Sequence, residues 1–125
     1  MHRTILGAVA ALCLAAAAAA DPVEGTWRTQ PSDTGATLDV RIAACGGAIC
    51  GTAVRLNGPG NQAVVGRPII WDMRAQGGGA YRGGKVWAPD QDKTYNSKMT
   101  LSGDRLKVEG CVLVICRGQT WSRVN

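Results

Sequence analysis

The sequence predicts an all-β protein, an eight-stranded antiparallel up-and-down β-barrel, with a two-sheet β-sandwich as the alternative. Segments such as residues 37–42 alternate polar and apolar side chains with a period of two, which suits strands that bury one face. Glycine, proline, serine and aspartate separate these segments at short intervals, and no stretch after residue 20 has helical periodicity. Short antiparallel strands that follow one another in the chain form a closed barrel or two stacked sheets.

The chain begins with a segment typical of a secretory signal peptide. A short basic start is followed by an almost entirely apolar stretch over residues 5–20, which ends in small residues before Asp21-Pro22. This layout predicts cleavage after Ala20. A membrane anchor is disfavoured because the stretch is short and alanine-rich and no stop-transfer signal follows. We expect a signal peptide over residues 1–20, one β-barrel domain over residues 21–125, no transmembrane anchor, and a periplasmic or secreted location.

Eight strands are expected in chain order, and each ends at residues that favour a turn. Residues 37–42 and 94–101 alternate most clearly, whereas the other candidates are less regular. The one long connection, residues 57–67, is rich in glycine and closes with Arg67-Pro68. The expected strands are Val23–Thr29, Thr37–Ile42, Cys50–Leu56, Ile69–Arg74, Ala80–Trp87, Thr94–Leu101, Leu106–Val112 and Gln119–Val124.

The composition of residues 21–125 disfavours several classes of function. The single histidine, His2, lies in the leader, so the domain lacks the commonest general base and zinc ligand. The net charge of +5 falls to +4 without Arg3, and the basic residues are dispersed rather than gathered into a stripe for nucleic acid. We expect no metal, no cofactor and no nucleic-acid partner. An enzyme is the least favoured function because no nucleophile–base pair is recognisable.

Isolated carboxylates are interpreted as surface charges. Asp90 and Asp92 are too few for a calcium ion, which takes six to eight oxygen ligands, and fit a solvated turn. Asp72 and Glu109 have no catalytic partner that the sequence reveals, so each is expected on the outer face of a strand.

Four cysteines in the domain form two pairs with the same spacing, Cys45 with Cys50 and Cys111 with Cys116. Thiols in a small exported domain indicate disulfides, and a zinc site is disfavoured because its paired ligands are usually closer in sequence. In an eight-strand meander the two pairs lie at opposite ends, whereas a disulfide joins α-carbons only about 4.4–6.8 Å apart. We therefore expect each pair to form a local disulfide at the end of a hairpin.

The first cysteine pair conflicts with the strand pattern. If these two cysteines face each other across a four-residue turn, Arg41 lies opposite Val54, and charged and apolar side chains share one face. A β-bulge near Ala43-Ala44 or Cys50-Gly51 would restore the pattern, so we expect one there.

The two ends of the domain carry a further pattern. Gly25-Thr26-Trp27 near the start and Arg123 near the end resemble the signature of lipocalins and calycins. A barrel pairs its first and last strands, which would bring the two segments side by side. In those barrels the arginine packs on the tryptophan and plugs one end, a desolvated cation–π contact worth about 2 kcal/mol. We expect Trp27 to be buried against Arg123 rather than Arg117.

A longer set of motifs resembles the bacterial exported family called domain of unknown function 2147. The set comprises Asp21–Trp27, Val40–Gly51, Arg67–Trp71, Gly83-Gly84, Pro89, Lys93–Tyr95, Gly110-Cys111 and Gln119–Val124. The resemblance implies a small exported β-barrel of calycin type with no assigned activity. Ala88, Trp87 and Asp72 depart from the family pattern, where an acid, a tyrosine and a glycine are common. These changes argue against a function that needs an acidic rim at this turn.

We expect a monomer that binds a small apolar or amphipathic ligand or an envelope component. The alternative is a solid barrel that acts as a protein-interaction or inhibitor module through its loop end. An eight-stranded barrel is just wide enough to be filled by side chains or to hold one small ligand. The candidate interior residues are Trp71, Met73, Gly83, Gly84, Tyr95 and Met99, where Gly83-Gly84 leaves space for a bend or a ligand.

Four connections are expected at one end of the barrel, which we call the mouth: residues 30–35, 57–67, 88–93 and 111–116. The candidate binding rim there comprises Asn57, Arg67, Leu113, Val114 and Ile115. Residues 112–115 are all apolar, although a hairpin tip is usually polar. We expect them to fold inward and cap the core, because exposed apolar tips promote aggregation. The alternative is a stiff apolar edge for a ligand, a partner or a membrane surface.

Overall fold

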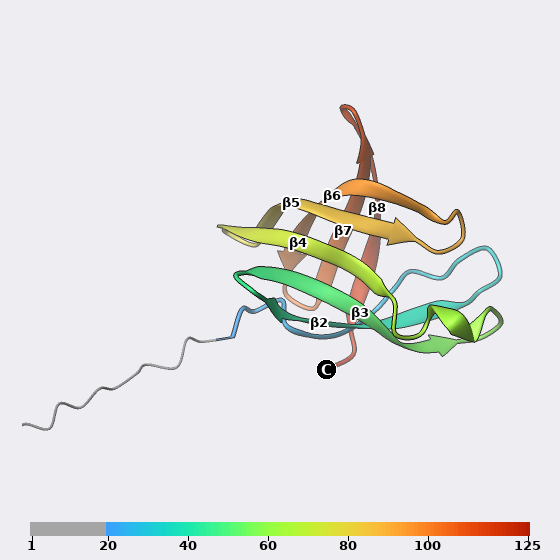
Figure 1. The fold of residues 1–125 in the computed structure, drawn as a ribbon. Coiled ribbons are helices and arrows are strands. Elements are labelled where there is room, and N and C mark those ends of the chain that lie inside the picture. Colours follow the sequence, from blue (N-terminus) through green and yellow to red (C-terminus); the bar gives the residue numbers. More distant parts are fainter. Residues whose placement is uncertain (1–19) are drawn as a thin grey trace, which may run out of the picture.

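The protein is a closed barrel of eight antiparallel strands, in which each strand pairs with the next and β8 pairs with β1 (Figure 1). The computed structural model describes residues 20–125, so the expected signal peptide lies outside the described residues except for Ala20. The up-and-down barrel is confirmed, and the two-sheet sandwich is wrong. The strands are β1 (Gly25–Arg28), β2 (Thr37–Cys45), β3 (Ala48–Asn57), β4 (Pro68–Gly77), β5 (Ala80–Ala88), β6 (Lys93–Ser102), β7 (Arg105–Val112) and β8 (Ile115–Arg123), with a short 3₁₀ helix, η1 (Gln62–Val64), between β3 and β4.

All eight expected strands are present, but the hairpins are longer than the sequence pattern indicated. β2 and β3 continue to Cys45 and Ala48, which are joined by Gly46-Gly47 with φ of 55° and 82°. Two consecutive residues with positive φ make a turn whose twist matches that of the strands. β8 begins at Ile115 rather than Gln119, because its pairing with β7 extends almost to the end of the hairpin.

The expected bulge exists in the β2–β3 pair but at a different place. Cys50 lies opposite Ala43, so the predicted four-residue turn and the bulge near it are wrong. The register shifts instead between Asp39 and Val40, where Val54 is the extra residue on β3. The shift keeps the apolar residues of β2 and β3 on the buried face. The register also shifts around Gly51, but in the pairing of β3 with β4.

The core lies inside the barrel and extends as far as the mouth. Trp27, Val40 and Ala53 lie opposite one another on three consecutive strands and are all buried. Glycine is required at Gly51, because a Cβ there would lie 2.8 Å from a methyl group of Val40. The other buried apolar residues are Val23, Leu38, Ile42, Ala48, Ile49, Ile69, Ile70, Met73, Tyr81, Trp87, Met99, Leu106, Val108 and Trp121.

The candidate interior residues separate into three groups. Met73 and Met99 are fully buried, and Gly84 is buried beneath Met73, since a Cβ on Gly84 would lie 2.6 Å from the Met73 sulfur. Trp71 is half-buried against the core. Gly83 is exposed with φ of 79°, so its prediction as an interior residue is wrong: it supplies a backbone conformation rather than space inside the barrel.

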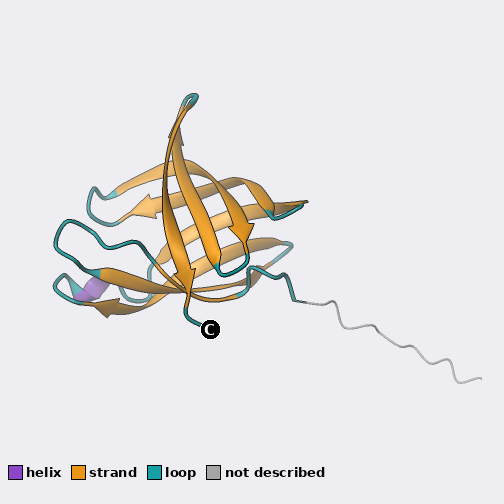
Figure 2. Cartoon of the chain, turned by 180° about the vertical axis from the view of Figure 1, so that it is seen from behind, coloured by secondary structure: helices purple, strands orange, loops and turns teal. Residues whose placement is uncertain are grey.

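The β7–β8 hairpin extends beyond the neighbouring strands, as both ribbon views show (Figures 1 and 2). Cys111 pairs with Cys116 across this hairpin, and Val112 lies opposite Ile115 one step further out. The other disulfide joins Cys45 and Cys50 near the β2–β3 turn. In the part of the chain that the structure describes, no helix has the length and apolar character needed to cross a membrane.

Candidate ligand-binding cavity

A cavity of about 1070 Å³ opens at the mouth of the barrel. Segments from all four expected mouth connections border it, which places these connections at one end of the molecule. Its walls come from strands, from η1 and from the loops of the mouth. The apolar side chains that form these walls are Leu38, Leu56, Val64, Ile69, Val86, Trp87, Val108 and Trp121.

Gly110 helps to form the wall of the cavity on β7. A Cβ on this residue would lie 3.3 Å from the Cβ of Tyr95 and 3.5 Å from a methyl group of Val86, so even an alanine would crowd the wall. Gly110 also lies opposite Arg117, whose long side chain borders the same cavity. The glycine therefore leaves room between these side chains.

Polar side chains form the rim of the cavity, and several of them are held by hydrogen bonds. Gln119 accepts a hydrogen bond of 2.7 Å from the indole nitrogen of Trp121. The Tyr95 hydroxyl donates to Gln91 Oε1. These bonds orient polar groups around an apolar interior, which is the usual arrangement of a small-molecule site.

Arg67 and Trp87 form a second fixed element of the rim. The guanidinium carbon of Arg67 lies 3.9 Å from the centroid of the Trp87 ring, within the range of a cation–π interaction. Trp87 Nε1 donates a hydrogen bond of 2.9 Å to Asp92 Oδ1. The structure thus places Arg67 at the mouth as part of an ordered Arg67–Trp87–Asp92 group.

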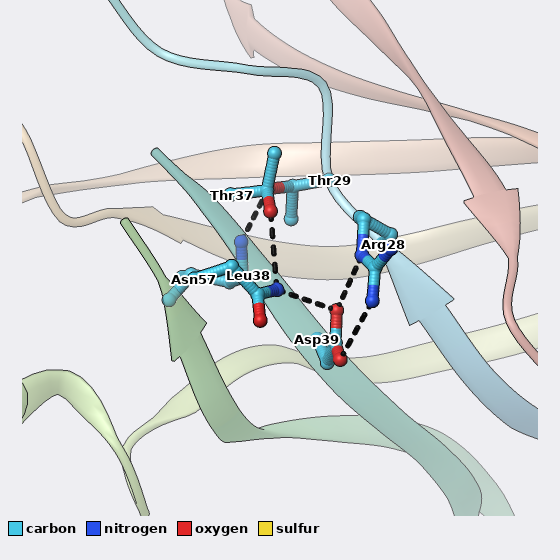
Figure 3. Close-up of polar contacts among 6 residues, drawn as sticks. All are labelled: Arg28, Thr29, Thr37, Leu38, Asp39 and Asn57. Carbon is cyan, nitrogen blue, oxygen red and sulfur yellow. Dashed lines mark hydrogen bonds and ion pairs between the residues drawn. The ribbon is translucent and has the colours of Figure 1, made fainter. Parts of the chain in front are cut away.

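Asn57 lies away from the cavity, so its prediction as a rim residue is wrong. Its amide nitrogen donates to Thr37 Oγ1 at 3.1 Å and to Asp39 Oδ1 at 3.0 Å (Figure 3). Arg28 donates to the same carboxylate from Nε at 2.8 Å and from a terminal nitrogen at 3.2 Å. Because Arg28 lies directly opposite Asp39 and is exposed, this group belongs to the outer face of the barrel.

Arg28 and Asp39 form an ion pair that the sequence pattern did not reveal, and Asn57 adds a hydrogen bond to it. Asp39 is only 5% exposed. The hydrogen bond from Arg28 lowers the pKa of the Asp39 carboxyl, burial opposes this, and Asn57 adds to the lowering. Asp39 in turn raises the pKa of the Arg28 guanidinium. The group joins β1, β2 and β3 on the side of the barrel next to the mouth.

Residues 112–115, which we call the tip, are exposed. Val112 is 59%, Leu113 93%, Val114 94% and Ile115 67% exposed. The expectation that these side chains fold inward is therefore wrong. The β7–β8 ladder continues to Val112 and Ile115, so the hairpin stays extended rather than bending over the core. All four residues border the outer part of the cavity.

The opposite end of the barrel is filled by the contact between its first and last strands. Trp27 and Arg123 lie directly opposite each other in the β1–β8 pair, and the guanidinium carbon of Arg123 lies 4.3 Å from the Trp27 ring centroid. The guanidinium also donates to the carbonyl oxygens of Glu24 and Pro22 at 3.1 and 2.8 Å. Gly25 has no room for a side chain, since a Cβ added there would lie 2.6 Å from Asn125 O.

The sequence of this barrel matches the model of a bacterial family described as "Uncharacterized protein conserved in bacteria (DUF2147)" over residues 25–123. The chain belongs to the DUF2147 family. Protein HP1028 from the human pathogen Helicobacter pylori, whose structure is described as belonging to the lipocalin family, is similar to this DUF2147 chain with a TM-score of 0.68. The match covers 82% of each chain at 18% sequence identity and therefore shows a shared fold. No curated protein matches the chain.

Several residues of this DUF2147 cavity were not among the predicted site residues. Leu38, Val108 and Trp121 look like ordinary buried strand residues in the sequence, and only their meeting at one end shows that they line a cavity. Tyr95, a predicted interior residue, borders the cavity. Among residues 20–125, no three histidine, cysteine, aspartate or glutamate side chains lie close enough together to hold a metal ion.

Proposed function

We propose that this DUF2147 protein binds a small apolar or amphipathic ligand in the mouth cavity and performs no chemical reaction on it. The observation that carries the proposal is the cavity itself, about 1070 Å³ with walls of aliphatic and indole side chains. Ligand sites in proteins typically have volumes of about 300–1,000 Å³, apolar walls and a few oriented polar groups. A barrel filled to both ends would instead favour a protein-interaction module.

The distribution of polar groups favours an amphipathic ligand over a purely apolar one. Arg67, Arg117 and Gln119 border the cavity, and the side-chain oxygen of Gln119 accepts a hydrogen bond from Trp121 Nε1. An apolar chain or ring would contact the walls, while a carboxylate or other polar head would remain at the rim. Guanidinium groups bind carboxylates and phosphates well because their paired donors match the oxygen geometry.

We also propose that the protein works in the periplasm or outside the cell after cleavage of residues 1–20. The sequence of the leader carries this proposal. The two disulfides support it, since disulfides persist in oxidising compartments and are rare in reducing ones. An exported carrier or sensor of an amphipathic molecule fits both the compartment and the cavity.

Filling the cavity tests the proposal. Gln119→Trp adds bulk to the cavity, and Thr120→Trp adds the same side chain at the next residue, which is exposed and does not border the cavity. We expect the wild type to bind a fluorescent fatty acid such as cis-parinaric acid saturably at one site. Gln119→Trp should weaken this binding at least about tenfold, whereas Thr120→Trp should leave it unchanged. Absence of saturable binding by the wild type, or equal loss in both variants, would contradict the proposal.

A further inference from the structure

The tip is an apolar projection that contributes nothing to the core. Leu113 and Val114 are more than nine-tenths exposed, and none of the four tip residues belongs to the apolar cluster that fills the barrel. Exposed apolar side chains that lie singly on a surface are ordinary. Four consecutive ones at the end of a projecting hairpin form a patch of the kind that marks an interaction site.

The backbone conformation at Leu113 in the tip is also unusual for a leucine. Leu113 has φ of 57°, a left-handed conformation that glycine, asparagine or aspartate adopt far more readily than leucine. The other non-glycine residues with positive φ in the described part of the chain, Asp72 and Asp92, are aspartates. Leucine is therefore an unfavourable residue for this backbone conformation, and its side chain does not belong to the core.

The tip is held in a defined shape. The Cys111–Cys116 disulfide crosses the hairpin directly beneath it, and the strands remain paired up to Val112 and Ile115. Binding of such a tip to a partner or a lipid surface costs little conformational entropy, because its backbone is already ordered. Arg117 follows the disulfide and is exposed, so a cation lies close to the apolar end.

We propose that the tip inserts into the surface of a lipid bilayer, with its aliphatic side chains among the acyl chains and Arg117 at the level of the phosphate groups. A stable protein partner buries about 800 Å² on each side and relies on aromatic or arginine anchors. The tip is instead the end of a projecting two-stranded hairpin and carries only aliphatic side chains (Figures 1 and 2). Acyl chains accept such a projection without complementary shape. Lipid is therefore the occupant that this geometry favours over a second protein.

The position of the tip gives this contact a role in the proposed function. All four tip residues border the mouth cavity, so a bilayer that receives the tip lies next to the opening. An amphipathic ligand could then pass between bilayer and cavity with little exposure to water. This role rests on the proposed ligand binding, whereas insertion of the tip does not require it.

Binding to vesicles of pure phosphatidylcholine tests the insertion, because these vesicles carry no net charge and exclude general attraction to the basic protein. Processed protein from an exporting host is sedimented with the vesicles. Leu113→Gly and Val114→Ser should each lower the partition constant at least about tenfold. The control Val54→Ser removes an exposed valine from the β3 bulge and should leave the constant unchanged. Since glycine suits the backbone at residue 113, a loss in Leu113→Gly is not a folding defect.

Two further measurements separate the outcomes. If the tip variants bind vesicles as well as the wild type does, the insertion is wrong. If they instead abolish self-association seen by light scattering without vesicles, while vesicle binding persists, the tip contacts a second copy and the lipid proposal fails. Gln119→Trp, which changes the cavity but not the tip, separates the two proposals. When both hold, Gln119→Trp loses fatty-acid binding measured without vesicles but binds vesicles as the wild type does, whereas the tip variants lose vesicle binding.

Discussion

Arg123 on the last strand covers the indole ring of Trp27 on the first, at 4.3 Å from the ring centroid, and the two residues are direct partners where the barrel closes. Trp27 is fully buried, and its Nε1 donates a hydrogen bond of 2.8 Å to Val23 O. Arg123 ties the same strand end to Pro22, Glu24 and Asp104. One contact therefore both fills an end of the barrel and fastens the N-terminal segment to the last strand.

We predict that Trp27 and Arg123 stabilise the barrel as a coupled pair. Trp27→Ala should lower the free energy of unfolding by about 3–5 kcal/mol, as truncation of a buried aromatic side chain does. Arg123→Ala should cost less, because Arg123 is partly exposed. In a double-mutant cycle measured by urea denaturation, the coupling free energy should reach about 1–2 kcal/mol. Purely additive losses would show that the contact is incidental.

The Asp39 ion pair should make stability depend on pH in the acid range. The pKa of Asp39 is lowered in the folded state, chiefly by the hydrogen bond from Arg28. Its contribution to stability is therefore fully present above the ordinary aspartate pKa of about 3.9 and is lost as the pH falls through the lower, folded-state value. Asp39→Asn removes this contribution.

The measurement is the urea midpoint of both proteins between pH 2 and pH 6. The urea midpoint of the wild type should exceed that of Asp39→Asn at pH 6, and the difference between the midpoints should shrink as the pH falls below about 4. The variant Asp33→Asn, which changes an exposed carboxylate in the mouth segment, serves as the matched control. A difference between wild type and Asp39→Asn that is constant over this range would contradict the assignment.

We predict that the exported protein is both cleaved after Ala20 and fully oxidised at its four remaining cysteines. Protein recovered from the native host should begin at Asp21 and contain no free thiol among Cys45, Cys50, Cys111 and Cys116, because each of these cysteines is in a disulfide. The backbone nitrogen of Asp21 lies 3.1 Å from Glu24 Oε2, so cleavage after Ala20 would create an ammonium group beside a carboxylate. Intact mass before and after alkylation checks both points. Two or more reactive thiols without reductant would contradict the oxidised state.

Relieving the backbone strain at Leu113 in the tip should stabilise the barrel. Leu113→Gly replaces a residue whose φ of 57° disfavours leucine, and the lost side chain packs against nothing in the core. We expect the free energy of unfolding to rise by up to about 1 kcal/mol. Thermal and urea denaturation measure the change, with Val114→Ser as a variant of the same tip that should be nearly neutral. A clear fall in stability for Leu113→Gly would show that the leucine supports the fold.

Part of the candidate site could be predicted from the sequence. The up-and-down order of the expected strands placed residues 30–35, 57–67, 88–93 and 111–116 at one end, and Arg67 does border the cavity there. The cavity itself could not be predicted, because its volume depends on how side chains from different strands meet. Leu113, Val114 and Ile115 border the cavity as predicted. Asn57 and the inward fold of the tip were wrongly predicted, because a residue's direction at a strand end depends on the register and length of the hairpin.

The sequence by itself determined the number and order of the strands, the antiparallel pairing, the local disulfides and the closing contact of Trp27 with Arg123. The strands and disulfides follow from alternation, turn residues and spacing, which act over a few residues. The contact of Trp27 with Arg123 follows from the resemblance to the lipocalin signature, together with the rule that first and last strands pair in a barrel. Tertiary structure alone decided that the bulge lies at Asp39–Val40, that one end is hollow and that the tip stands out. These features depend on the register of whole strands and on the summed volumes of side chains distant in sequence, and neither is encoded locally.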